Sequence, residues 1–157
     1  MSKIIKRSQL KKLRNECASE NKRIALANGC FDILHIGHIN YLREAKKLAD
    51  VLVVALNSDD SVKKIKGEGR PIMKQNERAE LLCSIRYVDY VVIFDEINVI
   101  NILKELKPDY HCKGSDYSEN NVPEKFFSDA NNIKTVIVGG DRIESSSNII
   151  QKIIKLA

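Results

Sequence analysis

The sequence predicts an α/β fold in which a doubly wound, parallel, five-stranded sheet forms a single domain. Two observations support this prediction. Five short β-rich runs alternate with segments whose apolar residues have the 3.6-residue spacing of helices, and four of these runs are continuously apolar. Continuously apolar strands are typical of parallel sheets that are covered on both faces. Alternating strands and helices form right-handed crossovers, which wind the helices onto both sides of such a sheet.

Each predicted element has its own signal. The strands are expected at residues 23–28, 51–57, 90–94, 109–113 and 134–140. Helical spacing is found at 39–48, 76–85 and 97–106, and the serines at 145–147 are candidate N-caps for a last helix. Leu10, Leu13 and Cys17 indicate a helix ahead of the first strand. We therefore expect one domain, 1–157, with an N-terminal helical extension, 1–21, and a core, 22–157.

Composition limits the classes of partner. The chain has 26 Lys and Arg against 21 Asp and Glu, a formal net charge of +5 at pH 7, without one long basic block. This balance suits nucleotides and sugar phosphates and gives no specific indication of nucleic acid binding. No apolar run approaches the ~18 residues of a membrane span, and no signal-peptide core is present. The 4 cysteines are widely spaced, which fits a reducing compartment, so a cytoplasmic protein is expected.

The segment NGCFDILHIGH, which begins at Asn28, holds the densest group of candidate functional residues. Asn28 and Gly29 end the first predicted strand, and a glycine there lets backbone N–H groups approach a phosphate closely. His35 and His38 share one face at the start of the next helix, and Gly37 leaves this face open. Two imidazoles so placed can donate to a polyphosphate and stabilise charge that develops at phosphorus. The alternatives are a structural turn and a metal site, for which no third ligand follows at suitable spacing.

The loops after the second and fifth predicted strands add anion-binding groups at the same edge of the sheet. After the second strand, a basic run that ends at Lys66 leads into glycines and Arg70, which indicates either a solvated face or a flap over an anion. After the fifth strand, Ser145, Ser146 and Ser147 begin a helix, and one cap does not account for all three hydroxyls.

Three further residues have weaker signals. Lys113 and Asp116 follow the fourth predicted strand, where a lysine can receive a phosphate and an aspartate can accept from sugar hydroxyls, although the segment alone is also an ordinary turn. Arg78, on a predicted helix, is by default a surface residue. No Ser-His-Asp order and no cysteine with a well-placed base is present, so the site is expected to hold phosphates in line rather than form a covalent intermediate. The P-loop and GxGxxG motifs are absent from the sequence.

These residues resemble a known family. GCFDILHIGH is similar to the GxFDxxHxGH signature of the HxGH nucleotidyltransferase superfamily, and SSSNII stands where those proteins carry a second, ISTT-like signature. Within the superfamily, the chain from about residue 22 to 154 resembles the D-glycero-D-manno-heptose 1-phosphate adenylyltransferase group, through NGCFDILHIGHINYLREAKKLAD, LNSDDSVKKIKGEGRP, KGSDY and SSSNIIQKI.

The resemblance implies a Rossmann-like nucleotidyltransferase in which a sugar 1-phosphate oxygen attacks the α-phosphorus of a nucleoside triphosphate and magnesium pyrophosphate departs. The implied catalytic residues are His35, His38 and Lys66. The implied nucleotide-binding residues are Asn28, Gly29, Cys30, Phe31, His35, His38, Ser145, Ser146 and Ser147. The implied residues near the phosphosugar or ribose are Asp32, Arg70, Arg78, Lys113 and Asp116, with Asp32 also near Mg²⁺.

The resemblance also implies partners and rivals. A homodimer or higher homo-oligomer is expected, with a separate sugar kinase that supplies the substrate and with no nucleic acid or membrane partner. The closest rival is a cytidylyltransferase for glycerol 3-phosphate or another phospho-alcohol, which shares the first signature and the RYVD at 86–89. A rival of another class is a non-catalytic nucleotide sensor. Class I aminoacyl-tRNA synthetases also carry HIGH, but they need a KMSKS-like loop and a longer chain.

The chain departs from the group's pattern at three places. Arg142 and Ile143 replace a Glu-Gly pair, serines replace two threonines at 146 and 147, and GSDY replaces GGDY at 114–117. The serines keep the hydroxyl groups, so the phosphate role is expected to survive. The altered pair at 142–143 is expected to change the loop shape and, through it, the choice of nucleotide.

Overall fold

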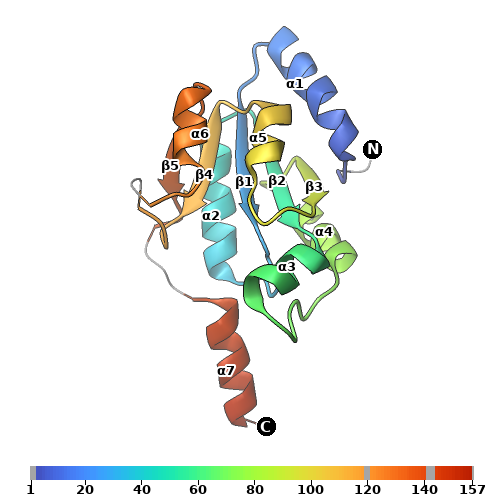
Figure 1. Cartoon of the computed structure of the whole chain (residues 1–157), viewed down its shortest axis with the longest axis vertical. Helices are drawn as coiled ribbons and strands as arrows, with labels where there is room; N and C mark the ends of the chain where they lie inside the picture. The colour runs from blue at the N-terminus through green and yellow to red at the C-terminus, as the bar shows by residue number, and fades with distance from the viewer. Residues whose placement is uncertain (1–2, 119–120, 141–143, 157) are drawn as a thin grey trace.

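The fold is a single α/β domain built on one parallel sheet (Figure 1). A computed structural model describes residues 3–118, 121–140 and 144–156. The strands are β1 (Ile24–Gly29), β2 (Val51–Asn57), β3 (Tyr90–Phe94), β4 (Tyr110–Gly114) and β5 (Lys134–Val138). Their order is β3-β2-β1-β4-β5 and every pairing is parallel. The predicted fold class and all five predicted strands are therefore confirmed. The bounds of β2 and β3 are as predicted, and those of the other strands differ by one or two residues.

Helices connect the strands. They are α1 (Leu10–Ser19), α2 (Ile36–Lys47), α3 (Asp59–Lys66), α4 (Gln75–Cys83), α5 (Ile100–Leu106), α6 (Lys125–Ala130) and α7 (Ser146–Leu156), with a short 3-10 helix, η1 (Arg7–Gln9), ahead of α1. Among the described residues, no helix is long and apolar enough to cross a membrane.

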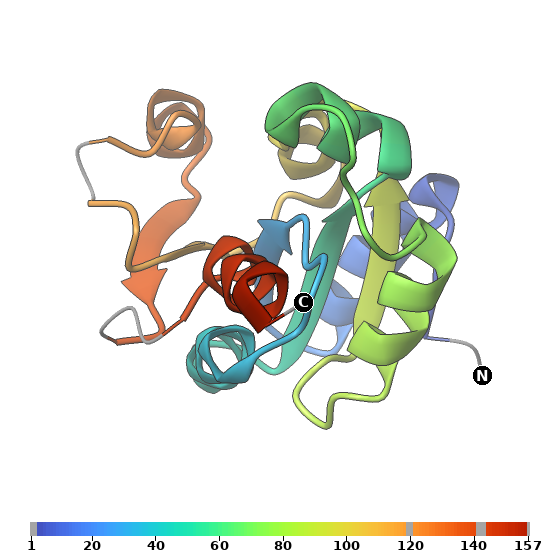
Figure 2. The same cartoon turned by 90° about the horizontal axis from the view of Figure 1, so that it is seen from below.

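Two apolar layers enclose the sheet. One layer contains Tyr41, Leu42 and Ala45 of α2 with Ala79 and Leu82 of α4. The other contains the buried residues of α1 and α5, namely Leu10, Leu13, Cys17, Ile102, Leu103 and Leu106. Figure 2 shows α2 and α4 on one side of the sheet and α5 and α6 on the other. The strands are buried from both sides, which is the physical reason for their continuous apolar runs.

Two helices were not predicted. The sequence predicts a loop after the second strand, but residues 59–66 form α3. Ser58 caps this helix by accepting from the Ser61 amide, and acidic residues occupy its first turn. Its apolar content is low, with Val62 buried and Ile65 exposed at 39%. Helix α6 is only six residues long, and Glu124 precedes it.

Helix α7 extends away from the rest of the fold (Figure 1), and none of its residues is buried. Its first turn nevertheless lies at the sheet edge where the strands end. There, Ser146 Oγ donates to the carbonyl of Ile33 at 3.1 Å. The N-terminal end of α7 is thereby joined to the segment that follows β1.

Candidate active site

A cavity lies at the point of the sheet where the order in which strands are added changes from one side of β1 to the other. The chain runs from β1 outward to β3 and then crosses back to β4 on the other side of β1. The connections after β1 and after β4 leave in opposite directions, which opens a crevice at the carboxyl ends of these strands. A cavity of about 490 Å³ lies there, lined by residues from the ends of β1, β2, β4 and β5.

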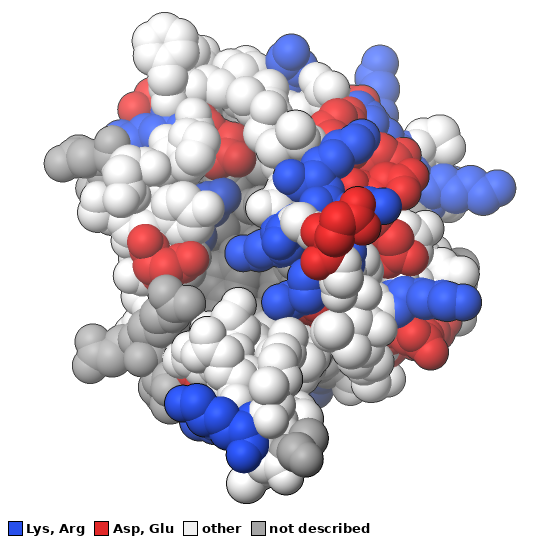
Figure 3. Space-filling view, turned by 60° about the horizontal axis from the view of Figure 1, so that its bottom comes forward, with Lys and Arg blue, Asp and Glu red and all other residues white. Residues whose placement is uncertain are grey.

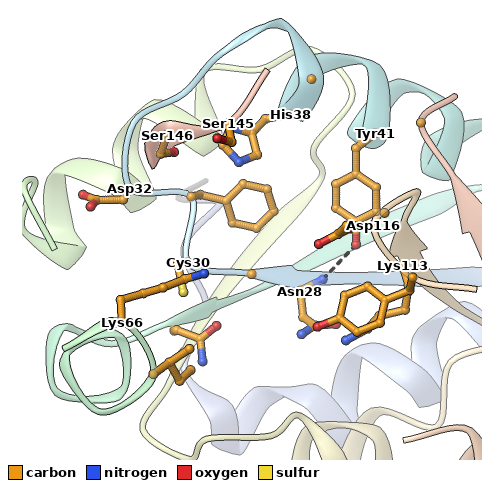
Figure 4. A pocket seen from close by; sticks show the side chains of 18 of the residues that line it. Asn28, Cys30, Asp32, His38, Tyr41, Lys66, Lys113, Asp116, Ser145 and Ser146 are labelled. Carbon is orange, nitrogen blue, oxygen red and sulfur yellow. Dashed lines mark hydrogen bonds between the residues drawn. The ribbon is translucent and has the colours of Figure 1, made fainter. Parts of the chain in front are cut away.

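The sequence-predicted residues converge on this cavity. Its walls include Asn28, Gly29, Cys30, Phe31, Asp32, His35, His38, Lys66, Arg70, Lys113, Asp116, Ser145, Ser146 and Ser147. Figure 3 shows a hollow on this face that is bordered on one side by lysine and arginine side chains. In Figure 4, His38, Ser145 and Ser146 lie close together, while Asn28, Lys113 and Asp116 form a second group. We refer to these two groups as the histidine half and the lysine half of the cavity.

His35 and His38 are packed against each other in the histidine half. Their ring centroids are 3.9 Å apart, and the ring of Phe31 lies 5.1 Å from that of His38. A β-carbon at Gly37 would come within 2.9 Å of the His35 ring. A side chain at 37 would therefore displace the imidazole of His35 from its present position, and glycine leaves that space to the ring.

His38 is neutral near pH 7. Burial, together with the neighbouring His35, lowers the pKa of His38 to about 4. The backbone N–H of His35 donates to Nδ1 of His38, at 3.4 Å. Because Nδ1 accepts, the proton of the neutral ring is on Nε2, which makes this atom a hydrogen-bond donor.

The three serines have different environments. Ser145 is the N-cap of α7, since its Oγ accepts from the Asn148 amide at 3.1 Å. Ser146 contacts the carbonyl of Ile33, and Ser147 is exposed while still lining the cavity. The partial positive charge of the α7 N-terminus therefore faces the same cavity as the histidines.

Lys66 and Cys30 lie on the side of the cavity formed by α3. Lys66 is the last residue of α3 and is exposed, and no ion pair joins it to a described residue. Burial raises the pKa of the Cys30 thiol, although the charges of Lys66 and Arg78 act in the opposite direction. A protonated thiol is a weak nucleophile, so Cys30 is suited to contact a ligand but not to form a covalent intermediate.

Both carboxylate oxygens of Asp32 accept hydrogen bonds from other groups of the protein. Its Oδ2 accepts from Arg70 Nε at 2.6 Å, and its Oδ1 accepts from the amides of Ile72 and Met73 at 2.8 and 3.0 Å. Burial raises the pKa of this carboxyl, but the bonds from Met73, Ile72 and Arg70 outweigh it and leave the pKa below its ordinary value. The side chain is 1% exposed. Asp32 therefore fastens the loop after α3 to the segment after β1.

The predicted metal role of Asp32 stays a prediction. Its Oδ1 already accepts two hydrogen bonds and its Oδ2 accepts one from the Arg70 cation, which would compete with a metal ion for this oxygen. Among the described residues, no three His, Cys, Asp or Glu side chains are grouped so that they could hold a metal ion. A hard cation such as Mg²⁺ prefers oxygen ligands and usually binds through phosphates and water. The cavity therefore suits a magnesium ion that enters on a polyphosphate.

Arg78 differs from both sequence-based expectations, because it is neither a surface residue nor part of the cavity wall. It is 0% exposed. Its guanidinium donates to the carbonyls of Met73, Cys30 and Asn57 and to the carboxylate of Asp59 at 2.6 Å. Arg78 thus joins three loops that form the cavity, and these contacts use four of its five N–H donors.

In the lysine half, Lys113 is almost buried and its Nζ lies 3.2 Å from Glu124 Oε2. The same Nζ is 4.6 Å from the centre of the Tyr117 ring. Asp116 is exposed at the mouth of the cavity. Glu124 therefore reduces the positive charge that the sequence alone indicated at Lys113.

Several cavity residues were not predicted, namely Tyr41, Asn57, Tyr117, Glu124 and Glu144. Tyr41 bonds to the carbonyl of Cys112, far along the chain, and Glu124 pairs with Lys113, and no spacing in the sequence marks either residue. His111 was not predicted either. It does not line the cavity but contacts Asn28, which does, and its only signal was a polar residue within the fourth predicted strand. The altered pair Arg142 and Ile143 lies outside the described residues.

Comparisons with known proteins agree with this geometry. The profile of the cytidylyltransferase-like family matches residues 26–152. The bifunctional protein HldE of Campylobacter fetus is 49% identical over 133 residues, which cover 84% of this chain and 28% of HldE. HldE of Helicobacter acinonychis is 43% identical over 144 residues, with 92% of this chain and 30% of the relative covered. The chain thus spans less than a third of these relatives.

A solved structure is also similar. The crystal structure of the lipopolysaccharide core biosynthesis protein from Thermoplasma volcanium matches 77% of this chain and 99% of its own, with 33% identity and a TM-score of 0.66. The family profile covers both groups that form the cavity, from the end of β1 to the start of α7. The chain belongs to the cytidylyltransferase-like family.

Proposed function

We propose that this protein is a nucleotidyltransferase that transfers the adenylyl group of ATP to D-glycero-D-manno-heptose 1-phosphate. The single observation that carries the proposal is the histidine half, where two imidazoles and the N-terminal turn of α7 face one cavity. The names of the HldE relatives and of the lipopolysaccharide core biosynthesis protein support the choice of heptose.

The reaction joins the phosphate of the sugar to the α-phosphate of the nucleotide by an in-line displacement at phosphorus. An oxygen of the sugar 1-phosphate forms a bond to the α-phosphorus of the triphosphate, and the bond from that phosphorus to the bridging β-phosphate oxygen breaks. Pyrophosphate leaves with the electron pair. No covalent intermediate with the protein is needed, in agreement with the protonated Cys30 thiol.

The protein's part is to hold the triphosphate and stabilise the charge of the transition state. In this proposal, His38 donates from Nε2, His35 contacts the same phosphates, and Lys66 approaches from α3. Such preorganised donors lower the barrier because they need no rearrangement as charge develops. Ser147 binds the phosphates at the start of α7, and the hydroxyl of Ser146 turns from the Ile33 carbonyl to the same phosphates when they bind. Mg²⁺ arrives as part of the nucleotide substrate.

The lysine half then receives the remainder of the substrates. Lys113 offers a cation and Asp116 offers acceptors for sugar hydroxyls, while Arg70 lines the cavity beside Asp32. We propose further that a separate sugar kinase supplies the 1-phosphate and that the protein acts as a homo-oligomer.

A substrate panel tests the proposal. Heptose 1-phosphate and glycerol 3-phosphate are each combined with ATP, CTP or GTP in the presence of Mg²⁺, and pyrophosphate release is measured. The proposal expects release with heptose 1-phosphate and ATP. Release only with CTP and glycerol 3-phosphate would instead assign a phospho-alcohol cytidylyltransferase. Binding of nucleotide without release in any combination would assign a nucleotide sensor.

A further inference from the structure

His111 is an ionisable residue in the interior of the sheet. It lies on β4 beside Leu26 of β1 and Thr135 of β5, and it is 0% exposed. A polar ring at such a position lowers stability unless it makes a hydrogen bond. The bond that it makes is therefore informative about its role.

His111 makes this bond to a cavity residue. Its Nε2 lies 3.0 Å from Oδ1 of Asn28. Asn28 follows Leu26 by two positions on β1, so the side chains of Asn28 and His111 are on the same face of the sheet. An amide oxygen can only accept, so Nε2 carries the proton. Burial lowers the pKa of His111 to about 3, which keeps the ring in this neutral form.

The other ring nitrogen agrees with this assignment. Nδ1 of His111 is buried and has no hydrogen-bond partner among the described residues. If Nε2 were the acceptor, Nδ1 would be a buried N–H without a partner, and such orphaned donors are rarer than orphaned acceptors. The nearby charge of Lys113 also disfavours a proton on this ring.

Asn28 is consequently held from both faces of the sheet. Its backbone N–H donates to Tyr41 Oη at 3.3 Å, and Tyr41 in turn donates to the carbonyl of Cys112. With Oδ1 bonded to His111, the side-chain NH₂ group has no acceptor among the residues that the structure describes, and Asn28 lines the cavity. Figure 4 shows it beside Lys113, in the lysine half.

We propose that His111 is a positioning residue that holds the Asn28 carboxamide with its NH₂ group toward the cavity, as a hydrogen-bond donor to an oxygen of a bound substrate. This inference rests on the proposed function for the nature of the substrates. A carboxamide that is free to turn presents an oxygen or an NH₂ group to a ligand, and only the second attracts phosphate or hydroxyl oxygens. The proposal makes His111 a determinant of affinity although it touches no substrate.

The test is a double-mutant cycle on binding. Titration calorimetry gives the Kd of MgATP and, separately, of heptose 1-phosphate for the parent, His111→Leu, Asn28→Ala and the double variant. His111→Leu is expected to raise one of these Kd values about tenfold, the effect of one hydrogen bond. The double variant is expected to match Asn28→Ala alone, because His111 acts only through Asn28.

Two further variants separate positioning from packing. In His111→Gln, the amide nitrogen can take about the position of Nε2 of the histidine. The affinity is then expected to return to within about threefold of the parent, a difference below that of one hydrogen bond. In His111→Asn, the amide nitrogen takes about the position of Nδ1, and no recovery of the affinity is expected. Thr135→Val is the matched control, since Thr135 is the register neighbour of His111 and its Oγ1 also has no partner among the described residues. Its Kd values are expected to equal those of the parent.

The outcomes are distinct. A double variant in which the two single losses multiply would overturn the proposal, as would an unchanged Kd for both ligands in His111→Leu or a Gln variant no better than the Asn variant. If His111→Leu does not fold, the Kd values of His111→Gln and His111→Asn are compared instead, and they decide whether His111 is a positioning residue. If the parent binds its ligands but releases no pyrophosphate, the proposed function fails, while these binding measurements still decide the role of His111.

Discussion

The carboxylate of Asp32 and the guanidinium of Arg70 form a 2.6 Å ion pair that is almost closed to solvent, with side chains 1% and 16% exposed. The pair joins the segment after β1 to the loop after α3, and so connects the histidines to the element that carries Lys66. Neither side chain needs a ligand to explain its position.

Asp32→Asn tests whether this carboxylate acts as an anchor or as a metal ligand. Loss of its charge leaves the largely covered Arg70 without a counter-ion, so urea unfolding is expected to show a loss of about 3 kcal/mol, as for broken buried pairs. The Mg²⁺ concentration that gives half-maximal pyrophosphate release is expected to stay unchanged. Glu68→Gln is the control, because its pair with Lys63 is exposed. A large increase in the Mg²⁺ requirement would show instead that Asp32 binds the metal.

Arg78→Met is expected to act on stability. It removes a buried cation whose donors bond three carbonyls and Asp59, and it leaves these acceptors unpaired. A loss of about 3–5 kcal/mol in the free energy of unfolding is expected. Arg86→Met, at an exposed arginine, is expected to change stability by less than about 0.5 kcal/mol. A higher KM for either substrate with unchanged stability would restore the substrate-binding role that the family resemblance implies for Arg78.

Acid is expected to destabilise the fold through two histidines. Burial lowers the pKa of His38 to about 4 and that of His111 to about 3. Unfolded histidines titrate near 6.5, so between this value and the folded pKa the unfolded state binds more protons. Stability is therefore fully present above about pH 7 and falls as the pH decreases.

For each of these histidines, the decrease from pH 7 to 5 is expected to be about 2 kcal/mol. The measurement is the urea midpoint at both pH values. His111→Gln removes one titrating group. Its free energy of unfolding is therefore expected to decrease between the two pH values by about 2 kcal/mol less than that of the parent. An equal loss in the parent and the variant would contradict a depressed pKa for His111.

The sheet could be predicted from the sequence because its strands are buried on both faces, which leaves an uninterrupted apolar run such as VLVVALN. Helix α3 could not. Its sequence DDSVKKIK has two apolar residues, and its stability depends on the Ser58 cap and on charges that complement the helix dipole, which an apolar-spacing criterion does not detect.

The histidine half of the cavity was also predictable, since glycines and histidines at fixed spacing follow one strand directly. The supporting residues were not. Arg78 is buried because four acceptors, three of them from other segments of the chain, meet around it. His111 contacts Asn28 because of the register between β4 and β1. These properties arise from tertiary structure. A single sequence does not give the register between strands, so these contacts could not be predicted from it.

The measurement that tests the central claim most directly is single-turnover pyrophosphate release by His38→Ala, together with its affinity for MgATP. The account predicts a rate at least about 100-fold below that of the parent, because one preorganised donor to the transition state is lost. The affinity for MgATP is expected to fall much less, and the fold to remain intact. An unchanged rate of release in His38→Ala would contradict the account.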